Sequence, residues 1–93
     1  MTNERFDSVW DAIEVTPAQA ENMRLRSSLM MALKDHITRE DLTQNQAAQL
    51  FSVTQPRVSD LMRGKIAVFG LDSLVNMAAA AGLRVEIRIA EPA

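Results

Sequence analysis

The chain has 93 residues, 47% of them hydrophobic, and its ten Lys and Arg against twelve Asp and Glu give a formal charge of -2. This length fits one small domain and excludes a multidomain enzyme. A domain of this size buries only about 60% of the surface that its unfolded chain exposes. Because the chain contains no cysteine to supply disulfides or thiolate metal sites, we expect it to gain stability by association.

The N-terminal segment, residues 1–16, combines aromatic and acidic side chains. Phe6, Val9, Trp10 and Ile13 lie at helical spacing among acidic residues. The segment either closes the protein's own core or docks on a basic partner protein, with Phe6 and Trp10 as the contacts. It has no apolar signal sequence, and no later run reaches the roughly 20 residues of a membrane span. We therefore expect a cytoplasmic protein that binds no membrane.

A long amphipathic helix is predicted over residues 17–39. Thr16 can cap it, Pro17 suits its first position, and Gln19 completes a capping box. Residues three or four positions apart form its inward face: Leu25, Leu29, Ala32, Leu33, His36 and Ile37.

Two short helices are predicted next. Thr43 and Gln46 form a second capping box at the start of the first, and Thr54 can cap the second, which ends at Gly64. Their inward residues are Ala47, Ala48, Leu50 and Phe51 in the first helix and Val58, Leu61 and Met62 in the second. Only two residues, Ser52 and Val53, separate the helices. The pair therefore forms a helix-turn-helix arrangement.

A fourth helix is predicted over residues 71–81, and it ends before Gly82. Its inward residues are Leu71, Leu74, Val75 and Ala78. The pattern then changes to a period of two, which predicts a half-buried strand with Leu83, Val85, Ile87 and Ile89 on one side. No other segment offers a partner strand, so we expect this strand to pair with its copy in a homodimer across a two-fold axis.

The helix-turn-helix arrangement points to DNA as the partner, because its second helix lies in the major groove. The outward residues of that helix are Gln55, Arg57, Ser59 and Asp60. Amide, guanidinium and hydroxyl groups can all hydrogen-bond base edges. Residues 43–65 carry three bases against one acid, and both flanks are net negative. Arg63 and Lys65 are therefore placed to contact phosphates beside the bases.

The run TQNQAAQLFSVTQPRVSDLMRGKIAVF, residues 43–69, resembles the helix-turn-helix core of the XRE family of Cro-like regulators. With AENMRLRSSLMMAL before it and LDSLVNMAAAAGLRVEI after it, the chain resembles the HigA-like antitoxin branch over residues 20–89. The resemblance implies a mainly α, lambda-repressor-like bundle of four to five helices with a C-terminal β-strand that pairs across a homodimer. The expected parts are an N-terminal segment (1–16), the DNA-binding domain (17–82) and a dimerisation strand with its tail (83–93).

The resemblance also implies a function. The chain is expected to be a sequence-specific repressor of a palindromic operator in double-stranded DNA, and the antitoxin of a type II pair that autoregulates its operon, with a RelE/HigB-like toxin as partner. The alternatives are a stand-alone phage-type regulator and an interaction module that neutralises a toxin with little DNA binding. The implied base-reading residues are Gln55, Pro56, Arg57, Ser59 and Asp60, and the implied phosphate contacts are Thr43, Gln44, Thr54, Arg63 and Lys65.

Three departures from the family pattern bear on stability. Ser52 stands where the family usually has Gly at the turn, Phe51 stands where it often has Leu, and Gly70 replaces the commoner Ser cap of the fourth helix. A catalytic function is not expected, since no nucleophile with a base and no glycine-rich phosphate loop can be found. His36 is the lone imidazole, so we expect neither a metal nor a cofactor.

Overall fold

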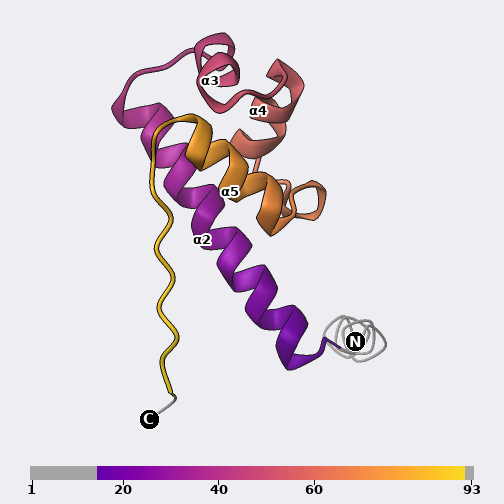
Figure 1. Cartoon of the computed structure of the whole chain (residues 1–93). Coiled ribbons are helices and arrows are strands. Elements are labelled where there is room, and N and C mark those ends of the chain that lie inside the picture. Colours follow the sequence, from indigo (N-terminus) through magenta and orange to yellow (C-terminus); the bar gives the residue numbers. More distant parts are fainter. Residues whose placement is uncertain (1–14, 92–93) are drawn as a thin grey trace, which may run out of the picture.

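The structure, a computed structural model, describes residues 15–91 of the chain. This part folds into four α-helices and one short 3-10 helix (Figure 1). They are α2 (Pro17–Arg39), α3 (Gln44–Phe51), α4 (Gln55–Met62), η1 (Ile66–Val68) and α5 (Leu71–Ala80). The mainly α prediction is confirmed. Phe6 and Trp10, the predicted partner contacts, lie outside the described residues.

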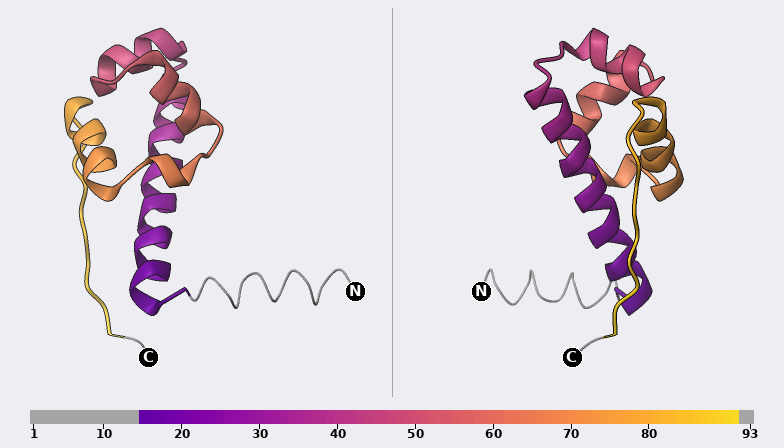
Figure 2. Two further views of the ribbon diagram at one scale, coloured as in Figure 1. Left: turned by 90° about the vertical axis from the view of Figure 1, so that its right-hand side faces the viewer. Right: turned by 60° about the vertical axis from the view of Figure 1, so that its left-hand side comes forward.

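Helix α2 begins where its capping box predicts. The Thr16 hydroxyl oxygen accepts from the Gln19 N–H at 3.1 Å, and the Gln19 side-chain oxygen accepts from the Thr16 N–H at 2.9 Å. The first half of α2 projects beyond the other helices (Figure 2), and its first buried residue is Met30. On this projecting half the Arg24 guanidinium hydrogen-bonds the Glu21 carboxylate and holds the pKa of that carboxyl below its ordinary value. None of the described helices is long and apolar enough to cross a membrane.

One hydrophobic core joins all four α-helices. Helix α3 packs on α4 and α5, α2 packs on α5, and both η1 and α4 contact α2. The buried side chains are Met30, Leu33 and Ile37 of α2, Ala47, Ala48 and Phe51 of α3, Val58 and Leu61 of α4, Phe69, and Leu74, Met77 and Ala78 of α5. Every buried residue in the described part is hydrophobic. The core therefore fixes the position of α4 from two sides.

One inward residue predicted for α5 was wrong. Leu74, Met77 and Ala78 are buried, whereas Val75 is 37% exposed. Val75 and Leu71 instead line an apolar groove of about 370 Å³ between α2, α5 and the C-terminal segment. A helix of this hydrophobic composition offers two apolar faces, and the single chain covers only one of them.

The predicted C-terminal strand is not formed within the described chain. Residues 83–91 are extended without a secondary-structure ladder, and from residue 84 onward their backbone makes no hydrogen bond to residues 15–91. The physical reason is that a strand needs a second strand, and the described part offers none. Val85 packs against the core, while Ile87 and Ile89 are 71% and 94% exposed. The single chain therefore shows neither the predicted strand nor its pairing across a homodimer.

Candidate nucleic-acid interface

The turn between α3 and α4 depends on one residue in the left-handed conformation. Ser52 has φ 57° and ψ 44°, which places a non-glycine residue where the family resemblance favours Gly. The Val53 N–H donates to the Ala48 carbonyl at 3.0 Å and closes the end of α3. The extended backbone of Thr54 then starts α4. The sequence LFSVTQ thus produces the sharp change of direction between the two helices.

Helix α4 presents its first turn to solvent and buries the opposite side. Val58 and Leu61 are fully buried, while Gln55 and Pro56 are exposed and Ser59 is half-buried. The structure therefore brings three of the predicted base-reading residues to one accessible edge. Gln55 supplies an amide, Ser59 a hydroxyl and Pro56 an apolar ring.

The Arg57 side chain is engaged within the protein. Its Nη1 donates to the Val68 carbonyl at 2.9 Å, and its guanidinium carbon lies 4.4 Å from the centre of the Phe69 ring. The residue was predicted to read a base from a free, outward position. To reach a base, the guanidinium has to leave both contacts or use the nitrogens that face away from Val68.

Asp60 and Lys65 form an ion pair, with 3.6 Å between the carboxylate Oδ1 and Nζ. The Asp60 carboxylate reduces the attraction of Lys65 for a phosphate and would itself repel one. Arg63 is exposed, and within the described residues it forms no ion pair. Arg63 is therefore the stronger phosphate-binding candidate of the two predicted cations.

The two helix starts differ in the donors that they can offer to a phosphate. At α3, the Thr43 hydroxyl oxygen accepts from the Gln46 N–H at 3.1 Å, so its proton remains free to donate. The first amides of α3, beginning with that of Gln44, have no partner within the helix. At α4, Pro56 has no N–H and the Arg57 N–H bonds the Thr54 carbonyl at 3.1 Å. The start of α4 therefore offers a phosphate the backbone N–H of Gln55 and the hydroxyl of Thr54, because the Thr54 side chain makes no cap bond.

Arg26 of α2 contacts the turn that follows α4, and nothing in the sequence predicts this contact. Its Nη1 donates to the carbonyls of Ile66 at 3.1 Å and Phe69 at 3.2 Å. Both acceptors lie in the turn between α4 and α5, forty or more residues away in the chain. No local pattern around Arg26 indicates this contact.

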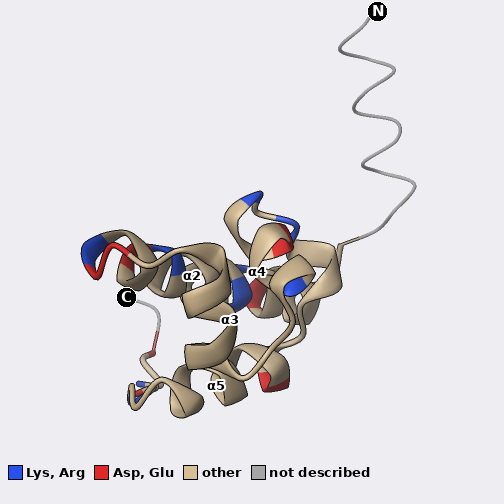
Figure 3. Cartoon of the chain, turned by 90° about the horizontal axis from the view of Figure 1, so that it is seen from above, with Lys and Arg blue, Asp and Glu red and all other residues tan. Residues whose placement is uncertain are grey.

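Basic residues do not form one continuous stripe on this end of the molecule. Figure 3 looks onto α3 and α4 from above, and its blue segments are separated by tan and red ones. Along α4, the neutral polar residues Gln55 and Ser59 stand on either side of Arg57 in the sequence. A surface of this kind combines a modest electrostatic attraction with hydrogen-bonding groups that can distinguish bases.

The sequence matches a family described as a helix-turn-helix domain over residues 13–90, a range that includes all the helices of the described part and most of the C-terminal segment. The chain belongs to this helix-turn-helix family. Helix-turn-helix domains bind DNA, so the family match indicates DNA as the partner of this chain. None of the curated proteins matches this helix-turn-helix chain. The family match alone does not distinguish the HigA-like branch from other regulators of this kind.

Proposed function

We propose that this protein is a sequence-specific transcriptional repressor that binds a palindromic operator as a homodimer. The observation that supports it most is the edge of α4 formed by Gln55, Pro56 and Ser59, whose amide, ring and hydroxyl lie on a helix held by the buried Val58 and Leu61. A helix fixed in this way can present the same side chains to each major groove that it enters. The role is recognition of DNA and involves no catalysis.

Base reading is assigned mainly to Gln55 and Ser59. A glutamine amide can bond adenine bidentately, and a hydroxyl can bond either base of a pair. Pro56 would contact a thymine methyl, and Asp60 would accept from a cytosine amino group only by loosening its ion pair with Lys65. Phosphate contacts are assigned to Thr43, Gln44, Thr54, Arg63 and Lys65, which lie at the two helix starts and just after α4.

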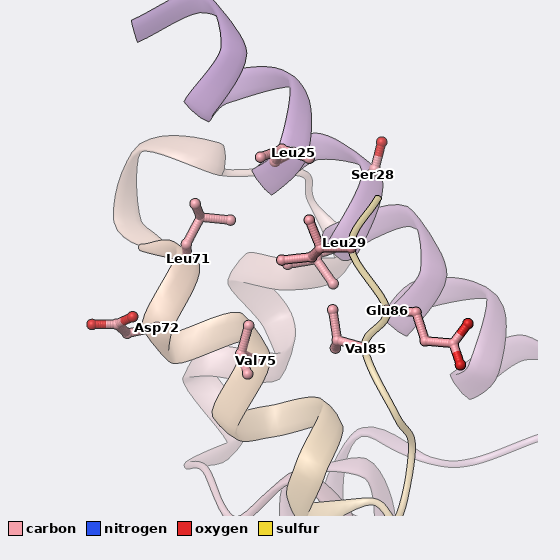
Figure 4. Close-up of a pocket in the computed structure, with 9 residues that line it drawn as sticks. Leu25, Ser28, Leu29, Leu71, Asp72, Val75, Val85 and Glu86 are labelled. Atoms are coloured by element: carbon pink, nitrogen blue, oxygen red, sulfur yellow. The ribbon is translucent and has the colours of Figure 1, made fainter. Parts of the chain in front are cut away.

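The homodimer is supported by the C-terminal segment. From residue 84 onward its backbone has no hydrogen-bond partner in residues 15–91, and Ile87 and Ile89 expose their side chains to water. Unpaired extended backbone with apolar side chains favours pairing with another strand. Beside the segment lies the groove of α2 and α5, where Leu25, Leu29 and Val75 point inward while Asp72 and Glu86 point away (Figure 4).

The charges of the segment restrict the register of such a pairing. Arg84, Glu86 and Arg88 alternate with the apolar residues. An antiparallel pair centred on Val85 sets Arg84 opposite the partner's Glu86, and one centred on Ile87 sets Glu86 opposite the partner's Arg88. A pair centred on Glu86 sets like charges opposite each other and is disfavoured. Two α4 helices held about 34 Å apart by this sheet would match one turn of DNA.

The HigA-like antitoxin role, with a RelE/HigB-like toxin as partner, belongs to the same proposal and is supported by the sequence resemblance of residues 20–89. Co-expression with a toxin of that class tests the antitoxin role. If the full chain and its Gln55→Ala variant both relieve toxicity, the protein neutralises the toxin independently of DNA binding. If the full chain does not relieve toxicity, the antitoxin role is refuted and the protein is a stand-alone regulator.

The DNA-binding proposal is tested by selecting an operator from random duplexes and measuring affinities by fluorescence anisotropy. Gln55→Ala should weaken operator binding by about 1–3 kcal/mol and relax one base position. Arg63→Gln should weaken all duplexes alike and reduce the slope of log K against log salt by about 1 per protomer, which is about 2 for the dimer. Asn76→Ala removes an exposed amide from α5 and should change neither quantity. Failure of the selection to enrich any sequence would refute specific binding.

A further inference from the structure

The turn that follows α4, residues 66–69, is held by two guanidinium groups from different helices. Arg26 of α2 donates to the carbonyls of Ile66 and Phe69, and Arg57 of α4 donates to the carbonyl of Val68. Three of the four carbonyls in this turn therefore accept from an arginine. The Phe69 ring, which is 1% exposed, lies under the Arg57 guanidinium at 4.4 Å. The turn thus connects a side chain of α2 to a side chain of α4.

The charges of these two arginines are balanced by no carboxylate among residues 15–91. The ion pairs in this part of the chain are Arg24 with Glu21 and Lys65 with Asp60. Arg26 is half-buried, and its Nε is buried without a hydrogen-bond partner. Moving a cation partly out of water into contact with neutral carbonyls costs desolvation free energy, because no carboxylate offsets its charge. Stabilisation of the turn alone therefore does not explain why Arg26 is placed there.

That reason lies in the position of Arg57 on α4. Arg57 lies two residues after Gln55 and two before Ser59, the residues proposed to read bases. Its guanidinium is located by the Val68 carbonyl and the Phe69 ring, and those two groups are located by the bonds that Arg26 makes to the turn. A shift of the turn would therefore move the two groups that hold the Arg57 guanidinium, between Gln55 and Ser59, without any change in the backbone of α4.

We propose that Arg26 is a positioning residue of the DNA interface, which acts through the 66–69 turn and Arg57 without touching DNA. The inference rests on the proposed DNA-binding function, and it adds a residue of α2 to an interface otherwise built from α3 and α4. It predicts that the effects of Arg26 and Arg57 on operator affinity are coupled. Independent phosphate contacts would instead contribute separately.

A double-mutant cycle on operator affinity tests the coupling. Arg26→Met keeps the aliphatic stem and removes the donors, and we expect it to weaken operator binding by about tenfold. The double variant with Arg57→Met should bind no more weakly than Arg57→Met alone. Arg26→Lys retains one donor group and should recover part of the loss. Arg24→Met, two residues away on the exposed side of α2, should bind as the wild type does.

A measurement without DNA separates failure of this inference from failure of the proposed function. The Phe69 ring should shift the Arg57 side-chain protons upfield in the NMR spectrum of the free protein. Arg26→Met should reduce that shift, and Arg24→Met should leave it unchanged. Losses from Arg26→Met and Arg57→Met that multiply in the double variant, or an Arg57 shift that survives Arg26→Met in a folded protein, would overturn the inference. If Arg26→Met does not fold, Arg26→Lys allows the same comparisons with smaller effects.

Discussion

At the scale of single residues, the backbone of Ser52 sets the direction in which α4 leaves α3. The αL conformation costs an L-residue roughly 1–2 kcal/mol relative to the right-handed region. The turn nevertheless keeps a serine there, because the packing of Phe51 and Val58 in the core fixes both flanking helices. The sequence position therefore carries a strain that the fold tolerates.

Ser52→Gly should raise the free energy of unfolding by about 0.5–1 kcal/mol. Relief of the αL cost exceeds the additional backbone entropy that glycine loses on folding. Thermal unfolding followed by circular dichroism should show a Tm higher by about 2–8 °C. Ser52→Ala removes the same hydroxyl but keeps the strained φ, so it should give no increase. A lower Tm for the glycine variant would contradict this account of the turn.

Arg57 should differ from Gln55 in its effect on stability. Arg57→Gln removes the hydrogen bond to Val68 and the contact with the Phe69 ring, so we expect it to destabilise the free protein by about 1 kcal/mol. Gln55→Ala changes an exposed side chain and should leave the free energy of unfolding within about 0.5 kcal/mol of its original value. Equal melting curves for wild type and Arg57→Gln would show that the guanidinium is free in solution.

At the scale of elements, the helix starts were predictable because their signals are local. The capping boxes of Thr16 with Gln19 and of Thr43 with Gln46 each lie within four residues, and the structure confirms both. The contacts of Arg26 and Arg57 could not be predicted in this way. Their acceptors are carbonyls of the turn after α4, which lie 40 and 43 residues from Arg26 and 11 residues from Arg57 in the chain, so no local spacing indicates them.

Helix α5 should gain from a capping residue. Gly70 is its N-cap, with φ -87° and ψ 164°, and a Cβ there meets no atom within 4 Å. Gly70→Ser adds a hydroxyl that can accept from the first-turn amides, so we expect a gain of about 0.5–1 kcal/mol in unfolding free energy, measured by urea titration. Gly82→Ser at the other end of the helix has equal space but φ +78°, and it should be destabilising. A gain from both changes would show that capping is not the cause.

At the scale of the whole molecule, residues 15–91 leave apolar surface exposed along the groove between α2, α5 and the C-terminal segment. Val75 was expected in the core because its spacing matches that of Leu74 and Ala78. A hydrophobic period identifies which residues prefer burial, but it does not say whether the same chain or another one covers them. The same limit applies to the predicted strand, whose alternation was visible while its partner was not.

Reversing one charge in the C-terminal segment should weaken the proposed dimer. Glu86 is exposed, and in either favoured register it lies opposite an arginine of the partner subunit. We expect Glu86→Arg to raise the dimer dissociation constant several-fold in sedimentation equilibrium, since like charges opposite each other are destabilising. Arg84→Glu added to it should restore the dimer if the pair is centred on Val85, and Arg88→Glu should do so if it is centred on Ile87. A monomeric wild-type protein at all concentrations would refute the dimer itself.

If the proposed dimer forms, the extended backbone of residues 84–91, which makes no hydrogen bond to residues 15–91, would also link the protein's lifetime to its abundance. Proteases bind substrates as extended chain, so a monomer offers a cleavable stretch without any prior unfolding. Formation of a two-fold sheet would remove that stretch from proteolysis. At low abundance the chain would be trimmed quickly, and above the dimerisation midpoint it would persist, so that degradation itself would sharpen the threshold between an occupied and a vacant operator.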